Sequence, residues 1–175
     1  MDSDAIRAQC GRPGITADDL KNGVAQVSDD TQMTMFTANG LLFAQTRGMN
    51  RGIAGPWESY VFKAYQEWLF TQLGDMAERP AHRLTWVLNI PEMHSRRAPG
   101  NTCIQALRAG IMGSIDRPAN NSKGCGGVMR VAPVGLFFNP ERMPQQDIDM
   151  LGAKIAALTH GHPLGYIPAA MLTHI

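Results

Sequence analysis

The chain has little charge of either sign and no long apolar run. Asp, Glu, Lys and Arg make up 18% of its 175 residues, and the formal net charge is +1. Such a composition lacks the excess of basic side chains with which proteins neutralise nucleic-acid phosphates. No stretch approaches the roughly 18 apolar residues of a membrane span, and the N-terminus lacks a basic-then-apolar export signal. The sequence therefore indicates neither a nucleic-acid partner nor a membrane anchor.

Cysteine is also scarce. Cys10, Cys103 and Cys125 lie far apart and form no CxxC pair. This number and spacing indicate neither a disulfide framework nor a thiolate zinc site, and they favour a cytoplasmic location. Because 44% of the residues are hydrophobic, we expect one domain over residues 1–175 with a substantial core.

Apolar residues recur mostly at helical spacing, and strict alternation is rare. We expect helices over about 31–45, 56–73, 100–113 and 148–158, with a short helix start at 16–20. In the second segment one face is apolar and belongs to the core: Val61, Ala64, Tyr65, Trp68 and Leu69. The β-like stretch 128–138 contains Pro133 and Gly135, which argue against a central strand. The sequence thus predicts an all-α fold.

Two adjacent carboxylates open the first helical segment, where residues 28–31 are Ser-Asp-Asp-Thr. Carboxylate and hydroxyl oxygens suit Mg²⁺ or Mn²⁺, and the N-terminus of a helix favours negative charge. The same residues are typical of ordinary N-capping, which is the commoner use of such a tetrapeptide. On these four residues alone, both interpretations stay open.

A glycine-rich stretch follows at residues 120–130, Asn-Asn-Ser-Lys-Gly-Cys-Gly-Gly-Val-Met-Arg. Closely spaced glycines let a backbone approach a ligand, and successive N–H groups can cradle a phosphate. The stretch does not match a Walker loop, and Met129 stands where a dinucleotide fingerprint needs glycine. A plain flexible loop and a phosphate cradle are both compatible with it.

Two histidines mark the end of the fourth helical segment, in Thr-His-Gly-His-Pro at residues 159–163. Capping or core packing, ligand contact and zinc binding are the alternatives, and an HxH pair without further ligands is a weak zinc signal. The sequence lacks the GxSxG elbow of a serine hydrolase, and Cys125 has no base nearby in the sequence. A serine or cysteine nucleophile is therefore not indicated.

The last ten residues, 166–175, are apolar and have no polar tail. Removing these apolar side chains from water requires another protein surface for them to pack against. We expect this segment to dock on its own domain, to mediate self-association, or to belong with a longer product.

Four segments in this order, SDDTQMT, RAPGNTC, NNSKGCGGVMRVAPVGL and ALTHGHP, resemble the ADP-ribosylglycohydrolase family, also called ADP-ribosyl-acceptor hydrolases or the dinitrogenase reductase-activating glycohydrolase type. The resemblance covers about residues 27–175. It implies an orthogonally packed all-α bundle, a binuclear Mg²⁺ or Mn²⁺ centre, and hydrolysis of the glycosidic bond between ADP-ribose and a modified acceptor.

The resemblance also assigns residues. It implies that Ser28, Asp29 and Asp30 are metal ligands, with the two aspartates also catalytic. Ser122, Lys123, Gly124, Cys125 and Gly126 match the segment that holds ADP-ribose, and His160 matches the family histidine that reaches the ligand.

Three features depart from the family pattern. Cys125 stands where the family commonly has asparagine in a G-N-G loop, and neither the second metal motif, Asp-x-Asp-Thr, nor the initial Gly-Asp-x-x-Gly helix has a counterpart. We therefore expect an incomplete domain, truncated at both ends, with weak metal binding and without activity on its own. The alternative is a non-catalytic module that binds ADP-ribose or another nucleotide, and a purely structural role is a third possibility.

Overall fold

The computed structural model describes residues 2–12, 20–21, 24–53, 55–74 and 83–175. Its elements in chain order are α1 (Ser3–Cys10), β1 (Leu20–Lys21), β2 (Val24–Ala25), α2 (Asp29–Arg51), α3 (Trp57–Leu73), the 3₁₀ helices η2 (Val87–Asn89) and η3 (Pro91–Met93), α4 (Asn101–Arg108), the 3₁₀ helix η4 (Cys125–Arg130), α5 (Ala132–Phe137), α6 (Gln145–Ala157) and α7 (Pro163–His174). The all-α prediction is confirmed, since the described strands form only one two-residue antiparallel ribbon. Residues 16–19 of the expected N-terminal helix start lie outside the described residues.

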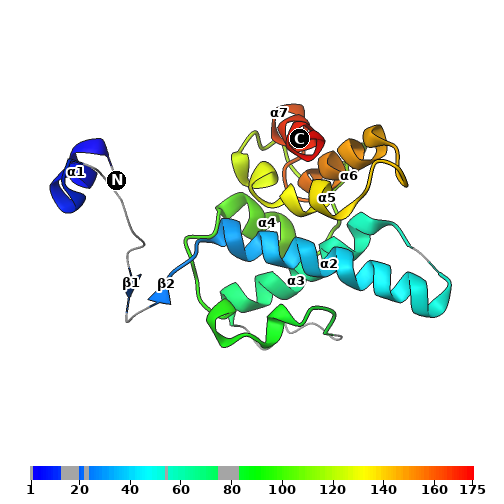
Figure 1. Cartoon of the computed structure of the whole chain (residues 1–175), viewed down its shortest axis with the longest axis horizontal. Helices are drawn as coiled ribbons and strands as arrows, with labels where there is room; N and C mark the ends of the chain where they lie inside the picture. The colour runs from blue at the N-terminus through cyan, green and yellow to red at the C-terminus, as the bar shows by residue number, and fades with distance from the viewer. Residues whose placement is uncertain (1, 13–19, 22–23, 54, 75–82) are drawn as a thin grey trace.

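The helical body is built around α2 and α3, with α5, α6 and α7 gathered on one side (Figure 1). In this view α1 and the ribbon extend away from the body, beyond the start of α2. None of the helices in the described ranges is long and apolar enough to cross a membrane.

Helices α2 and α3 pack closely because a glycine stands at their contact. A methyl group in place of Gly40 would lie 2.9 Å from the Cα atom of Val61. The face predicted for α3 is buried as expected, with Tyr65 and Trp68 fully inside the core. Burial of such aromatic side chains supplies a large part of the apolar stabilisation of a small core.

The third predicted helix ends earlier than expected. Helix α4 stops at Arg108, and Gly110 adopts a left-handed backbone conformation with φ of 69°. This turn ends the helix before the expected boundary near residue 113, and the side chain of Ile111, beyond the turn, is exposed. The prediction for 128–138 holds, since this stretch forms the end of η4 and helix α5 instead of a strand.

The apolar C-terminal segment forms α7, which packs on α6. His162 caps α7, Pro163 occupies its first turn, and Gly165, Ala169 and Thr173 are buried. The opposite face is exposed and includes Leu164, Ile167, Met171 and Ile175. The segment therefore docks on its own domain through one face, while self-association through the other face stays a prediction.

Candidate ligand and metal site

The predicted acidic pair lies at the first turn of α2. The backbone N–H of Asp29 donates to the carbonyl oxygen of Arg97 at 3.0 Å, and the Oδ2 atom of Asp29 accepts from the N–H of Gly100 at 3.2 Å. The side chain of Asp29 is buried, whereas that of Asp30 is exposed. The chain segment before α4 thus fixes the carboxylate of Asp29 in place.

Ser28 occupies the N-cap position of α2, but its hydroxyl does not cap the helix. The Oγ atom donates instead to Oδ2 of Asp30 at 2.7 Å. The interpretation of Ser28 as an ordinary side-chain N-cap is therefore wrong. The serine hydroxyl and the Asp30 carboxylate form one group of oxygen atoms beside Asp29.

The electrostatics of this group suit a cation. Burial raises the pKa of Asp29, the hydrogen bond from Gly100 opposes that rise, and the charge of Asp30 adds to it. A bound cation would offset the cost of placing both negative charges here. The hard oxygen donors of Ser28, Asp29 and Asp30 fit Mg²⁺ or Mn²⁺ in their chemistry. Within the described ranges, however, no group of three or more His, Cys, Asp and Glu residues is placed to hold a metal ion.

The start of α4 connects the acidic pair to the glycine-rich stretch. Gly100 contacts Asp29, as above, and two residues later the hydroxyl of Thr102 accepts a hydrogen bond from Ser122 Oγ at 3.5 Å. From α2, the hydroxyl of Thr34 donates to the carbonyl oxygen of Met129 at 3.0 Å. Segments that lie some 70 to 100 positions apart in the chain therefore meet at one place.

Asn120 fastens the glycine-rich stretch to the turn between α6 and α7. Its Nδ2 donates to the carbonyl oxygen of Thr159 at 2.8 Å, and its Oδ1 accepts from the N–H groups of Ser122 at 2.9 Å and Gly161 at 3.3 Å. The N–H of Gly124 then donates to Ser122 Oγ at 3.3 Å. The interpretation as a plain loop is wrong, because hydrogen bonds hold its first half and η4 forms its second half. We call residues 120–130 the glycine loop. Within it, Lys123 and Cys125 are exposed.

His160 lies directly beneath this loop and is only 2% exposed. A methyl group in place of Gly126 would lie 2.8 Å from the ring atom Cε1 of His160, and one in place of Gly124 would lie 3.3 Å from Nε2. Glycine at both positions thus allows the close approach of loop and ring. The second histidine, His162, serves as a cap and accepts from the N–H of Leu164 at 3.0 Å.

The ring of His160 is neutral at physiological pH. Burial and the positive charge of Arg130 lower the pKa of His160 to about 4. Its Nδ1 lies 2.9 Å from the hydroxyl of Thr159, while its Nε2 has no hydrogen-bond partner among the described residues. The predicted ligand-contacting histidine therefore carries a ring nitrogen that is available to a ligand at the loop.

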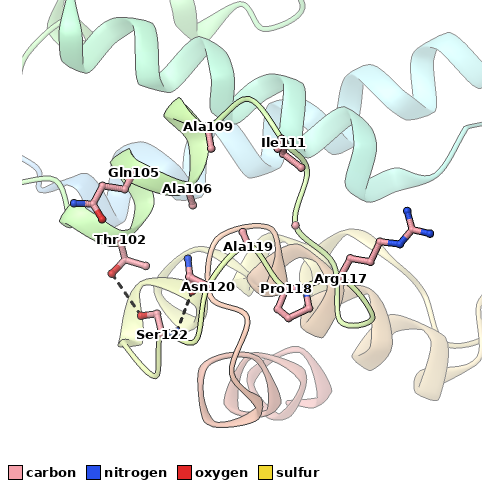
Figure 2. Close-up of a pocket in the computed structure, with 11 residues that line it drawn as sticks. Thr102, Gln105, Ala106, Ala109, Ile111, Arg117, Pro118, Ala119, Asn120 and Ser122 are labelled. Carbon is pink, nitrogen blue, oxygen red and sulfur yellow. Dashed lines mark hydrogen bonds between the residues drawn. The ribbon is translucent and has the colours of Figure 1, made fainter.

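A cavity of about 470 Å³ adjoins the loop. Figure 2 shows α4 along one side of it and the segment 111–122 along the other, with Ser122 hydrogen bonded to both Thr102 and Asn120. Its polar lining includes the side chains of Gln105 and Arg117. Its volume is within the range of small-molecule sites.

No sequence pattern indicated individual roles for Arg130, Thr159, Asn120 or Thr102. Arg130 is completely buried, and Thr159 is buried beside it. One signal was available, because Arg130 is the single charged residue in the otherwise uncharged stretch 124–140. An isolated charge in such a stretch is either exposed or held by specific partners.

Fold and site together define a helical protein in which the start of α4 contacts both an acidic pair and a glycine loop, and Asn120 and Ser122 of that loop line a ligand-sized cavity. A family model described as ADP-ribosylglycohydrolase matches residues 1–175. The chain belongs to this family, whose general activity is hydrolysis of ADP-ribosyl glycosidic bonds. Comparisons with curated proteins and with solved structures gave no match.

Proposed function

We propose that this chain binds ADP-ribose at the glycine loop and hydrolyses its glycosidic bond to a modified acceptor next to the acidic pair. One observation carries the proposal. The start of α4 joins the two motifs, through Gly100 to the carboxylate of Asp29 and through Thr102 to the hydroxyl of Ser122. A ligand held by the loop would therefore have its reacting end within the field of the carboxylates.

The loop suits the diphosphate. It places Lys123 at the surface, and the absence of side chains at Gly124 and Gly126 lets the ring of His160 approach its backbone. Backbone N–H groups and a basic side chain favour an anion. The adjoining cavity, which shares Ser122 with the loop, has room for the nucleoside part of the ligand.

The carboxylates suit the other end of the ligand. Glycosidic cleavage passes through an oxocarbenium-like transition state, whose positive charge a nearby carboxylate stabilises. Ser28, Asp29 and Asp30 would hold Mg²⁺ or Mn²⁺ by their oxygen atoms, and such a cation lowers the pKa of a water molecule and orients hydroxyl groups. Asp29 is the better fixed of the two aspartates, because burial and the Gly100 hydrogen bond restrict it.

A non-catalytic ADP-ribose-binding module is the second candidate. The specific observation behind it is that the described residues supply two carboxylates here and no larger group of metal ligands. Two carboxylates alone bind a divalent cation weakly. In that case the loop and cavity would bind ADP-ribose without a dependence on metal.

Calorimetric titration with ADP-ribose, with and without Mg²⁺ or Mn²⁺, separates the two candidates. The double variant Asp29→Asn/Asp30→Asn tests the acidic pair, and Asp147→Asn, an exposed aspartate of α6, is the matched control. Binding that needs metal and is lost only in the double variant supports the hydrolase, to be followed by an assay for release of ADP-ribose. Metal-independent binding in all three proteins supports the binding module. Absence of binding by the folded wild type contradicts both.

A further inference from the structure

Three buried side chains form a hydrogen-bonded row that ends beneath the glycine loop. The Nη2 atom of Arg130 donates to the hydroxyl of Thr159 at 2.7 Å, and this hydroxyl lies 2.9 Å from Nδ1 of His160. None of the three side chains is more than 2% exposed. Hydrogen bonds within the protein, rather than contacts with solvent, therefore determine which atoms of the row carry protons.

The donor and acceptor capacities of these groups fix the position of each hydrogen. A guanidinium only donates, so the oxygen of Thr159 must accept from Arg130. In the part of the chain that the structure describes, the remaining hydrogen-bond partner of this hydroxyl is Nδ1 of His160. If Nδ1 carried the proton, the hydroxyl hydrogen would be buried without an acceptor, at a cost of about 1–3 kcal/mol. The hydroxyl therefore donates to Nδ1, and the neutral ring carries its proton on Nε2.

The Nε2 atom faces the loop and has no partner of its own. Methyl groups in place of Gly124 and Gly126 would lie 3.3 and 3.1 Å from it, and no hydrogen bond joins it to any described residue. Nε2 is not one of the completely buried side-chain atoms that lack a partner, so it retains some accessible surface beneath the loop, where a ligand atom can accept its hydrogen bond. Because a donor suits an oxygen, the partner is an anionic oxygen such as that of a phosphate.

Arg130 itself is held firmly. Its Nη2 also donates to the carbonyl oxygens of Ile155 at 3.2 Å and Ala156 at 3.4 Å, and its guanidinium lies 4.6 Å from the ring centroid of Tyr65. Helix α6 and the ring of α3 thus fix the donor at the far end of the row. No carboxylate of a described residue pairs with this cation, so its charge adds to the attraction of an anion at the loop.

We infer that Arg130 and Thr159 are positioning residues that hold His160 as a neutral Nε2–H donor to a phosphate oxygen of the ligand at the glycine loop. The inference rests on the proposed ADP-ribose site and names how its diphosphate is recognised. Arg130 and Thr159 act through His160 and do not themselves touch the ligand.

The test is nitrogen NMR of the histidine rings in the unliganded protein, combined with ADP-ribose titration. The signals of His160 are assigned by their loss in His160→Gln. We expect a protonated Nε2 and an unprotonated Nδ1 in the wild type and in Thr159→Ser, which keeps the hydroxyl. Thr159→Val keeps the shape but removes the hydroxyl, so its ring should populate both tautomers. Its affinity for ADP-ribose should fall about tenfold, as expected for a weakened hydrogen bond to a charged group, and Thr159→Ser should restore it.

Two results would overturn the inference. One is a protonated Nδ1 in the wild type, which needs no variant and stays decisive if Thr159→Val does not fold. The other is a Thr159→Val protein with unchanged tautomer and affinity. If the wild type has the expected tautomer, and Thr159→Val changes it, but ADP-ribose does not bind, the proposed function fails while the positioning of the ring by Thr159 stands.

Discussion

The buried ring of His160 makes the stability of the protein depend on pH. Its pKa is lowered to about 4 in the folded protein, whereas an unfolded histidine titrates near 6.5. Between these values the unfolded chain binds a proton that the folded chain excludes, so the free energy of unfolding falls as the pH drops from 6.5 to 4. At its steepest this contribution is about 1.4 kcal/mol per pH unit.

The expected consequence is a weaker acid sensitivity of the His160→Gln variant over that range. Urea unfolding at a series of pH values measures the slope directly. Asn121→Ala, a change at an exposed side chain that does not titrate, is the control and should keep the wild-type slope. Equal slopes for the wild type and His160→Gln would contradict the buried, neutral state of this ring.

Some side-chain environments follow from the sequence and others do not. The helical spacing of Tyr65 and Trp68 predicted their burial correctly, because one face of an amphipathic helix must be covered. The burial of Arg130 could not be predicted in this way. Its partners include the carbonyl groups of Ile155 and Ala156 and the hydroxyl of Thr159, which no pattern near Arg130 reveals.

Helix α2 depends on a small residue where it meets α3. A Cβ atom added at Gly40 would lie 2.9 Å from the Cα and 3.2 Å from the N atom of Val61, and backbone atoms cannot rotate away. We expect Gly40→Ala to lower the free energy of unfolding by about 1–3 kcal/mol, as overpacking typically does. Chemical denaturation measures this change.

Gly100→Ala is the matched control, because a Cβ atom at Gly100 meets nothing within 4 Å and its φ is −63°. It should unfold close to the wild type. Equal stabilities of Gly40→Ala and the control would mean that the two helices are less closely packed than described.

Element types were predicted better than element ends. The expected helix over 56–73 is realised as Trp57–Leu73, since proline at its start and apolar spacing along its length agree. Helix α2 instead runs to Arg51, beyond the expected end near residue 45. Its last turns are exposed and have no apolar periodicity, so the sequence pattern did not indicate them. The early end of α4 depends on the left-handed conformation of Gly110. Glycine can adopt several backbone conformations, so the sequence alone does not indicate which one occurs here.

The glycine loop is joined to the α6–α7 turn by one side chain. Asn120 makes two hydrogen bonds across this junction, to Thr159 and Gly161, and a third within the loop, to Ser122. Asn120→Ala removes all three and leaves the carbonyl oxygen of Thr159 without this donor. We expect a loss of stability of about 1–3 kcal/mol, measured by thermal unfolding, and weaker binding of ADP-ribose.

The neighbouring Asn121 provides the comparison, because its side chain is exposed. Asn121→Ala should match the wild type in stability and in affinity. If Asn120→Ala behaves in the same way, the loop does not depend on this junction, and the described order of the loop would need another cause.

Over the whole molecule, the sequence indicated the family and a set of candidate site residues whose roles stay predictions, but it did not indicate how these residues are arranged in space. The motif order indicated the family correctly, and the acidic pair, glycine loop and His160 all lie near the start of α4 or the end of α6. The cavity could not be predicted, since its walls come from α4 and from the irregular segment 111–122. Their spacing depends on how the helices pack, which no local pattern encodes.

Mapping of ADP-ribose binding by amide chemical shifts tests the central claim most directly. The molecule offers a second cavity of about 440 Å³, lined by Trp57, Phe137, Phe138 and Arg142, as an internal comparison. We predict that ADP-ribose shifts the amide signals of residues 100–106, 117–126 and 160, and leaves those around the second cavity unchanged. Shifts confined to the second cavity, or none at saturating ADP-ribose, would contradict the assignment of the glycine loop as the ligand site.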